Sequence, residues 1–333
     1  MQLGLTPLFE QIVRAPQLDY VLATVVGTAG SSYRKAGAMM LLAPDLEPLG
    51  MVSGGCLEGD LMAHAEDVRS TTKAIRVHYD LSEDDAALWG LGLGCGGAID
   101  ILLEPAGKNT HFAGLGHVYP HWQSGRFCWW ERSTDPQPEF TPTVHRTAAT
   151  LDDAWRQSGD EPSRERTARL EQRLLIPVSP PPRLVVCGAG TDALPLVALA
   201  REVGWRVRLV DHRPALATSE RFAAGVDIVI CGPEQVAPSV FKRSDAVVIM
   251  AHHLQRDAMF LAAAMASDVR YVGLLGPTAR RDDVVARAAV RPDARLFGPA
   301  GLDIGANLPE TIALSIMAQA QAVVAGRSGG ALP

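Results

Sequence analysis

Residues 184–193 read Leu-Val-Val-Cys-Gly-Ala-Gly-Thr-Asp-Ala, and this stretch decides the fold of the second half of the chain. Gly188 and Gly190 follow a short apolar run in the spacing G-x-G-x-x-G/A, which Ala193 completes. Asp211 ends the next apolar run, at about the distance expected of a ribose-binding carboxylate. The pattern predicts a Rossmann-type fold. Two interpretations are open. Either these glycines and Asp211 hold a nucleotide-like ligand, or the protein has inherited the fold and binds no dinucleotide.

The rest of the second half supports a parallel sheet. Strand-like runs alternate with helical ones, as in βαβ units. The runs lie at 184–187, 207–210, 226–230, 246–250 and 270–273. His252 follows one of these strands, so it is expected at the carboxyl edge of the sheet, where ligands bind. A final helix is predicted at 308–325, with Asn307 and Glu310 in capping-box spacing.

The first half has mixed patterns. Helical spacing predicts helices at 5–15 and from Cys56 onward, with Cys56 to Glu58 as the first turn, and apolar runs predict strands. The predicted strands are 20–26, 37–42, 75–79 and 99–103, the last ending before Pro105. Residues 106–176 look irregular, with a strand at 127–130 and a helix at 168–175. Proline-rich residues 177–182 predict a linker. We therefore expect an α/β protein, with an N-terminal α+β domain at 1–176 and a Rossmann-like domain with a parallel sheet at 177–333.

Two glycine-rich loops each hold one cysteine. Residues 52–58 read Val-Ser-Gly-Gly-Cys-Leu-Glu, and residues 90–97 read Gly-Leu-Gly-Leu-Gly-Cys-Gly-Gly. Paired glycines let backbone N–H groups approach an anion, and a cysteine among such donors favours the thiolate. The loops therefore suit a ligand that carries phosphate and binds sulfur. The residues concerned are Gly54, Gly55, Cys56, Cys95, Gly96 and Gly97.

Each candidate also has a structural interpretation. Cys95 is the first choice for contacting sulfur or metal, and Cys56, placed at a helix start, is the second. Either could instead be a small packed side chain. Arg34 is the expected anion clamp, because guanidinium binds phosphate bidentately. Ser53 either donates to that anion or caps the next helix. Glu58 suits the first helical turn in any case.

Composition limits the class of protein. The chain has 333 residues, a net charge of −6, 47% hydrophobic and 20% charged residues. No basic block is present, so a nucleic-acid partner is not expected. No apolar run approaches the ~18 residues of a membrane span, and the first residues do not resemble a signal peptide. Five cysteines, an odd number, argue against a disulfide framework, so the cytoplasm is the expected compartment.

The motifs in both halves resemble the XdhC/CoxI family, accessory proteins that mature molybdenum hydroxylases such as xanthine dehydrogenase. The resemblance rests on the two cysteine loops and on several other segments. These are Gly30-Ser31-Ser32-Tyr33-Arg34, Gly37-Ala38-Met39, Gly188-Ala189-Gly190, Asp211-His212-Arg213, His252, Asp257, 273–276 and 298–310. Tyr33, where proline is expected, and Thr191, where histidine is frequent, depart from the family pattern.

The resemblance implies that the protein binds the molybdenum cofactor (molybdopterin), supports its sulfuration and inserts it into an apo molybdenum hydroxylase. It implies a chaperone more than a catalyst, with Cys95 and Cys56 as metal contacts. A cysteine desulfurase is a further expected partner. A homodimer is expected from the family and from the aromatic segment containing Trp129 and Trp130.

Three other interpretations stay open at this point. The Rossmann half could belong to an NAD(P)-dependent oxidoreductase, with Asp211 binding ribose and His252 as acid or base. Both loops could be structural parts of a regulatory protein. Cys56, Cys95 and His78 could form a zinc site, although the spacing is not that of a structural finger.

Overall fold

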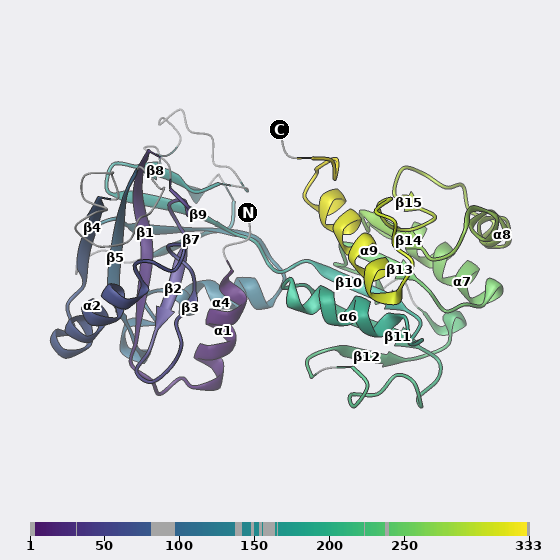
Figure 1. The fold of residues 1–333 in the computed structure, drawn as a ribbon, viewed down its shortest axis with the longest axis horizontal. Helices are drawn as coiled ribbons and strands as arrows, with labels where there is room; N and C mark the ends of the chain where they lie inside the picture. Colours follow the sequence, from purple (N-terminus) through teal and green to yellow (C-terminus); the bar gives the residue numbers. More distant parts are fainter. Residues whose placement is uncertain are drawn as a thin grey trace. The chain divides into compact units, whose positions relative to one another are not determined.

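The computed structural model consists of two compact units, Met1–Pro180 and Pro181–Pro333 (Figure 1). The sequence had placed this boundary at 176/177. The structure describes residues 4–30, 32–80, 97–136, 142–147, 150–152, 155, 164, 166–222, 224–236 and 240–331. Cys95 and Gly96 lie outside these residues. Among the described residues, no helix is both long and apolar enough to cross a membrane.

The N-terminal unit is built on a five-stranded antiparallel sheet in the order β3-β2-β1-β5-β4. Its strands are β1 (Tyr20–Gly30), β2 (Met39–Leu42), β3 (Leu49–Gly50), β4 (Ile75–Asp80) and β5 (Gly97–Ala106). β1 is buried along most of its length, as expected of a central strand. β5 continues through Pro105, so the predicted end of this strand before that proline was wrong.

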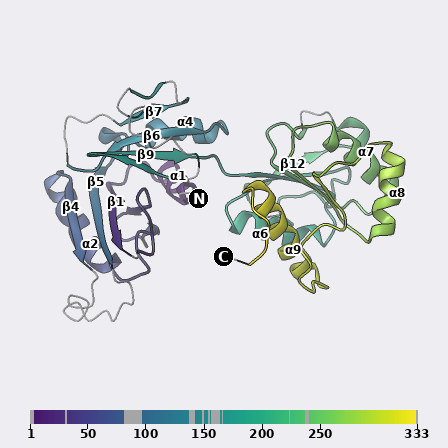
Figure 2. The same ribbon diagram turned by 90° about the horizontal axis from the view of Figure 1, so that it is seen from above.

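The two faces of this sheet bury different cores. Helix α2 (Glu58–Thr71) covers one face with Leu61, Ala65 and Val68, which recur at helical spacing and pack on alternate residues of the strands. The other face is covered by α1 (Leu5–Arg14), α4 (Leu115–Gln123) and a second sheet (Figure 2). The alternation of side chains along each strand makes this two-sided burial possible.

The segment predicted as irregular, 106–176, contains a second antiparallel sheet in the order β7-β6-β9-β8. It contributes η1 (Lys108–Thr110), α4, β6 (Cys128–Ser133), β7 (Thr143–His145), β8 (Ala168–Leu170) and the start of β9 (Arg173–Val178). The helix predicted at 168–175 is therefore wrong: β8 and β9 form a hairpin there. Trp130, fully buried, belongs to the core between the two sheets.

The C-terminal unit has the predicted parallel sheet, six-stranded in the order β12-β11-β10-β13-β14-β15. The strands are β10 (Arg183–Cys187), β11 (Arg206–Asp211), β12 (Asp227–Ile230), β13 (Ala246–Ile249), β14 (Tyr271–Leu274) and β15 (Leu296–Phe297). The order reverses between β10 and β13, which is where α/β sheets of this kind bind ligands.

Helices cover both faces of the parallel sheet. The four long helices are α6 (Ala193–Glu202), α7 (Leu254–Met265), α8 (Thr278–Ala288) and α9 (Pro309–Val324), and η3 (Pro233–Gln235) is a short turn. α6 and α9 bury apolar residues in one core, and α7 and α8 in the other. The start of α9 is capped by the Thr311 hydroxyl, which accepts from the N–H groups of Asn307 and Leu308. The predicted capping role of Glu310 was therefore wrong.

Candidate functional site

Topology brings the motif-bearing segments of the N-terminal unit to one end of its five-stranded sheet. β1 ends there at Gly30, which pairs with Gly97 at the start of β5. β4 ends there at Asp80, and β2 begins beside the end of β3, where the Met51 N–H donates to the Met39 carbonyl. We call this the loop end of the sheet. It carries the loops 32–38 and 51–57, and also Asp80 and Gly97, which border the residues 81–96.

The 51–57 loop is held by its own polar groups. Ser53, only 5% exposed, donates its hydroxyl to the Glu58 carboxylate at 2.8 Å. The Ser53 oxygen accepts from the N–H groups of Gly55 and Leu57, both at 3.3 Å. Ser53 and Glu58 were predicted as ligand contacts, and the structure shows them bonded to each other. Their bonds hold the loop in shape and leave the next residues facing outward.

Those next residues are open. Gly54 and Gly55 are exposed, and Gly55 has a φ of +107°, with no heavy atom within 4 Å of where a Cβ would stand. Cys56 is half-buried. The helix begins at Glu58 with Leu57 as its N-cap, so Cys56 precedes the helix by two residues. The prediction that Cys56 belongs to its first turn was therefore wrong. The loop thus presents backbone and one thiol at the surface.

Arg34 lies in the neighbouring 32–38 loop and is half-buried. Its Nε is buried and has no hydrogen-bond acceptor among the described residues. The two loops touch, because a Cβ on Gly54 would stand 3.9 Å from the Tyr33 ring. Buried N–H groups of proteins are nearly always paired, so an anion could supply the acceptor that this Nε–H lacks within the described part of the chain.

The second cysteine loop is described only at its last residue. Cys95 and Gly96 lie outside the described residues, and Gly97 is the half-buried first residue of β5. In the described part of the chain, no three His, Cys, Asp or Glu side chains gather closely enough to hold a metal. Of the four described cysteines, Cys128 and Cys187 are fully buried, and burial raises the pKa of Cys128 to about 12. Cys56 remains the described thiol that lies in a predicted ligand loop.

The glycine loop of the C-terminal unit contacts the Asp211 carboxylate. Oδ2 of Asp211 accepts from the Ala189 N–H at 2.6 Å and from Nη2 of Arg213 at 2.7 Å. Oδ1 accepts from the backbone N–H and Nε of Arg213. Burial alone would raise the pKa of Asp211, but these bonds and the Arg213 charge outweigh it and lower the pKa to about 2. Both carboxylate oxygens are therefore occupied by the protein itself.

Replacing Asp211 with asparagine is expected to destabilise the C-terminal unit in a pH-dependent way. Lowering the pKa from 3.8 to about 2 corresponds to about 2 kcal/mol, present above pH ~4 and lost as the pH falls through about 2. Urea unfolding should show this difference between wild type and Asp211→Asn at pH 7, and about half of it at pH 3. An equal difference at both pH values would contradict this account.

Gly188 has a φ of +121°, and a Cβ there would stand 2.5 Å from the Met250 carbonyl oxygen. Gly188→Ala is therefore expected to cost about 3 kcal/mol of stability, from backbone strain and the forced contact. Gly204→Ala is the matched control, because its φ of +84° carries strain but no atom lies within 4 Å. Denaturant unfolding of both variants should place Gly188→Ala well below Gly204→Ala; equal midpoints would refute the close approach.

His252 lies at the carboxyl edge of the parallel sheet, as predicted, next to the glycine loop. Its Nε2 lies 2.6 Å from Oδ2 of Asp192, and its φ is +56°, which is unusual for a residue other than glycine. The other oxygen of Asp192 stands 2.6 Å from where a Gly190 Cβ would lie. An acidic side chain therefore covers the glycine loop where a pyrophosphate would be expected.

Comparison with known proteins decides the family. The family model described as XdhC and CoxI family matches residues 13–80, and the XdhC Rossmann domain model matches residues 184–320. A probable xanthine dehydrogenase subunit of Bacillus subtilis is 30% identical over 324 residues, which cover 91% of this chain and 92% of that protein. The chain belongs to the XdhC and CoxI family.

Two further similarities support this membership. The molybdenum cofactor insertion chaperone PaoD of Escherichia coli is 24% identical over 313 residues, 91% of this chain and 83% of that protein. A crystal structure of a xanthine dehydrogenase from Bacillus halodurans is 31% identical with a TM-score of 0.78, and the match covers 100% of this chain and 98% of that one. The mixed fold of an antiparallel N-terminal unit and a Rossmann-like C-terminal unit is therefore shown.

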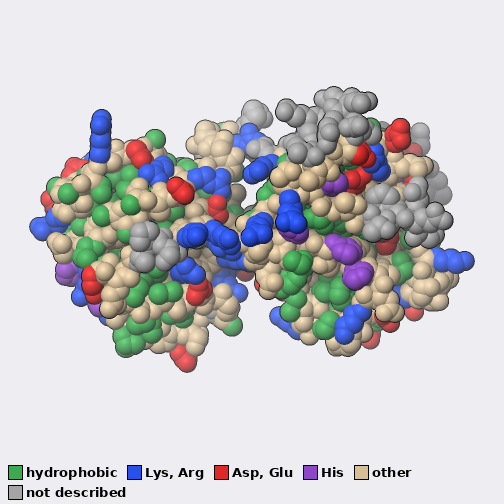
Figure 3. All heavy atoms as spheres, turned by 180° about the vertical axis from the view of Figure 1, so that it is seen from behind, with side chains coloured by type: hydrophobic (Ala, Val, Ile, Leu, Met, Phe, Trp, Pro, Cys, Tyr) green, Lys and Arg blue, Asp and Glu red, His purple; other side chains and the backbone are tan. Residues whose placement is uncertain are grey.

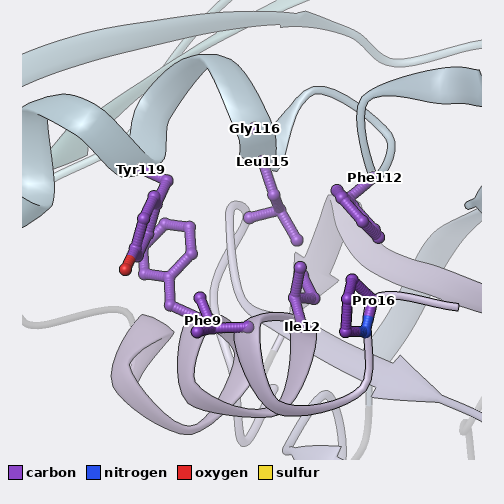
Figure 4. A pocket seen from close by; sticks show the side chains of 8 residues that line it. Phe9, Ile12, Pro16, Phe112, Leu115, Gly116 and Tyr119 are labelled. Carbon is purple, nitrogen blue, oxygen red and sulfur yellow. The ribbon is translucent and has the colours of Figure 1, made fainter. Parts of the chain in front are cut away.

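The two XdhC family models include most of the predicted site residues. Arg34 and the residues Ser53 to Glu58 fall within one match, and Gly188, Gly190, Asp211 and His252 fall within the other. The second sheet of the N-terminal unit and Gly97 lie between the two matches. An apolar cavity of about 200 Å³ lies between α1 and α4, lined by residues including Phe9, Phe112 and Tyr119 (Figure 4). None of the predicted site residues lines this cavity.

Proposed function

We propose that this member of the XdhC and CoxI family binds the molybdenum cofactor, supports its sulfuration and inserts it into a xanthine dehydrogenase-type hydroxylase. The names of its relatives, a molybdenum cofactor insertion chaperone and a probable component of xanthine dehydrogenase, support this proposal. A cysteine desulfurase as sulfur source, a homodimer and a cytoplasmic location are parts of the same proposal. The hydroxylase that receives the cofactor is the expected partner.

The observation that carries the proposal is Nε of Arg34, which has no acceptor among the described residues and lies beside an open glycine loop at the loop end. The cofactor is the cargo, and its phosphate would accept from Nε of Arg34 and from the Gly54 N–H, while Gly55, which carries no side chain, would leave room for its approach. Cys56, in the same loop, would bind the metal through its thiolate sulfur. We propose Cys95, Gly96 and Gly97 as the second half of this site.

The Rossmann-like unit is proposed to take part in a different way. Gly188, Gly190, Asp211 and His252 are the residues that would meet a nucleotide-bearing ligand. A ribose would have to replace Arg213 on the Asp211 carboxylate, and a pyrophosphate would meet Asp192 over the glycine loop. These contacts favour the chaperone over an NAD(P)-dependent oxidoreductase, because the dinucleotide contacts are already used by the protein.

Metal and pterin content test the proposal. The protein is purified from cells with and without a working cofactor pathway, and molybdenum and pterin are measured per chain. We expect molybdenum and pterin in similar amounts per chain when the cofactor pathway works, and neither of them when it does not. Tight NADH binding and turnover of an alcohol or acid, with no molybdenum or pterin, would favour the oxidoreductase instead.

A further inference from the structure

An exposed aromatic side chain lies at the loop end. Tyr33 is 66% exposed, more than any other large hydrophobic side chain of the described residues. Met51, at the start of the 51–57 loop, is 43% exposed. Large apolar side chains that gather at the surface around polar groups mark binding sites more often than single ones do. The Tyr33 ring therefore offers a π face to a ligand at this end of the sheet.

The backbone around Tyr33 is held in place. The Ser32 hydroxyl donates to the Arg34 carbonyl oxygen at 2.9 Å, so one hydrogen bond spans Tyr33. Further along the same loop, the Gly37 N–H donates to the Val25 carbonyl oxygen at 2.8 Å, which ties the loop to β1. A ring carried by a fixed backbone loses little conformational entropy when it binds a ligand.

The ring lies against the open glycine loop. A Cβ on Gly54 would stand 3.9 Å from Cγ of Tyr33, which is ordinary van der Waals contact, and a Cβ on Gly55 would meet no heavy atom within 4 Å. Cys56 follows these glycines, and Arg34, whose Nε has no acceptor in the part of the chain that the structure describes, follows Tyr33. An aromatic face thus adjoins the groups proposed to bind the phosphate and the metal.

We propose that Tyr33 stacks on the flat heterocyclic ring of the cofactor's pterin, an inference that rests on the proposed function. The cofactor joins this ring to a phosphate, and Arg34 and Gly54 serve the phosphate alone. Aromatic side chains bind planar heterocycles by offset stacking, which needs only a π face on each partner. Tyr33 stands where the family pattern predicts proline, which has no π face, so this contact is an addition to that pattern.

The test measures binding of a pterin without the metal. The probe is hydroxymethylpterin phosphate, titrated with the full chain, and its affinity and the quenching of its fluorescence are recorded. Inorganic phosphate, added as a competitor, measures the anion site by itself. The variants are Tyr33→Phe, Tyr33→Ala and Tyr33→Pro. Leu46→Ala is the matched control, because Leu46 is 39% exposed in the turn between β2 and β3, at the opposite end of that hairpin from the loop end.

We expect Tyr33→Ala and Tyr33→Pro to weaken binding of the pterin phosphate about 10-fold and to remove most of the quenching. Tyr33→Phe should stay within about two-fold of wild type, because stacking needs the ring and not the hydroxyl. Leu46→Ala should bind as wild type does. The dissociation constant of inorganic phosphate, obtained by competition, should be the same in every variant. Thermal unfolding should also be unchanged in Tyr33→Ala, because the ring is exposed.

Three results overturn the inference. They are unchanged affinity and quenching in Tyr33→Ala, an equal loss in Tyr33→Phe and Tyr33→Ala, and a wild-type chain that binds no pterin phosphate. The proposed function is decided separately, by the molybdenum and pterin content of the purified protein. A chain that carries both, together with any of these three results, keeps the proposed function and loses the stacking role of Tyr33.

Discussion

Arg132→Met is expected to destabilise the N-terminal unit by about 3 kcal/mol, because it leaves the half-buried Glu104 carboxylate without its partner. Arg132 is 2% exposed, between the two sheets. It pairs with Glu104, donates to the Thr24 hydroxyl at 3.0 Å and lies over the Trp130 ring at 4.4 Å. Burial raises the pKa of Glu104 and the Arg132 charge opposes that rise.

Two comparisons separate this cause from lost packing. The double variant Arg132→Met/Glu104→Leu should recover most of the stability, because neither charge is then left alone. In the single variant the pKa of folded Glu104 rises further above its unfolded value. Below the unfolded-state pKa, Glu104 is protonated in both states, and the loss of Arg132 costs least stability. As the pH rises from about 5 to about 8 the carboxyl ionises in the unfolded state first, so the destabilisation grows. Denaturant unfolding followed by tryptophan fluorescence measures both; equal losses in the single and double variants would refute the pairing.

Arg34→Ala is expected to weaken cofactor binding about 10- to 100-fold, the value of a charge-assisted hydrogen bond to phosphate. Lys35→Ala is the matched control, because Lys35 is the exposed neighbour in the same loop. Stability of Arg34→Ala should equal that of wild type or exceed it, because Nε has no acceptor among the described residues. Arg34→Lys should recover only part of the affinity, since an ammonium group cannot donate the two parallel hydrogen bonds that a planar guanidinium donates to a phosphate.

Retention of molybdenum and pterin after dialysis measures this affinity, and thermal unfolding measures stability. A loss of stability with unchanged retention would show that Arg34 is structural. Arg34→Ala and Lys35→Ala each remove one positive charge from the same loop, so a difference between them does not come from net charge. Basic and acidic side chains are interspersed on both units over the face drawn in Figure 3.

The Rossmann-like unit was predictable because its signals are local. Gly188, with its positive φ, and the strand before it lie within a few residues of each other, and Asp211 ends the next strand. The first cysteine loop was equally local, because its paired glycines and its cysteine lie within a few residues of each other. Both motifs are formed by residues close in sequence, so their structure depends little on the rest of the chain.

The second sheet was not predictable in this way. Residues 168–175 have helical spacing, and the turn between β8 and β9 has no glycine: Glu171 itself takes a φ of +49°. The strand forms because β9 pairs with β6, whose residues lie 40 to 50 positions earlier in the chain. Pro177 fits into β9 because β8 pairs only with Arg173 to Leu175, so that part of the strand lacks a second neighbour.

A polar pair on β4 and β5 of the N-terminal unit was missed for a similar reason. His78 and Asp100 are 22 residues apart, and only the register of β4 on β5 brings them together. His78 was considered only with the cysteines, as a zinc ligand. A charged residue inside the apolar run 99–103, facing away from α2, was the available signal.

Hydrogen exchange of the full chain, with and without bound molybdenum cofactor, tests most directly where the ligand binds. We predict that loading slows exchange in peptides covering 31–38, 51–57 and 97–100, with little change around the glycine loop at 188–192. Protection confined to the glycine loop, or to the helices that line the apolar cavity, would contradict a site built on the end of the antiparallel sheet.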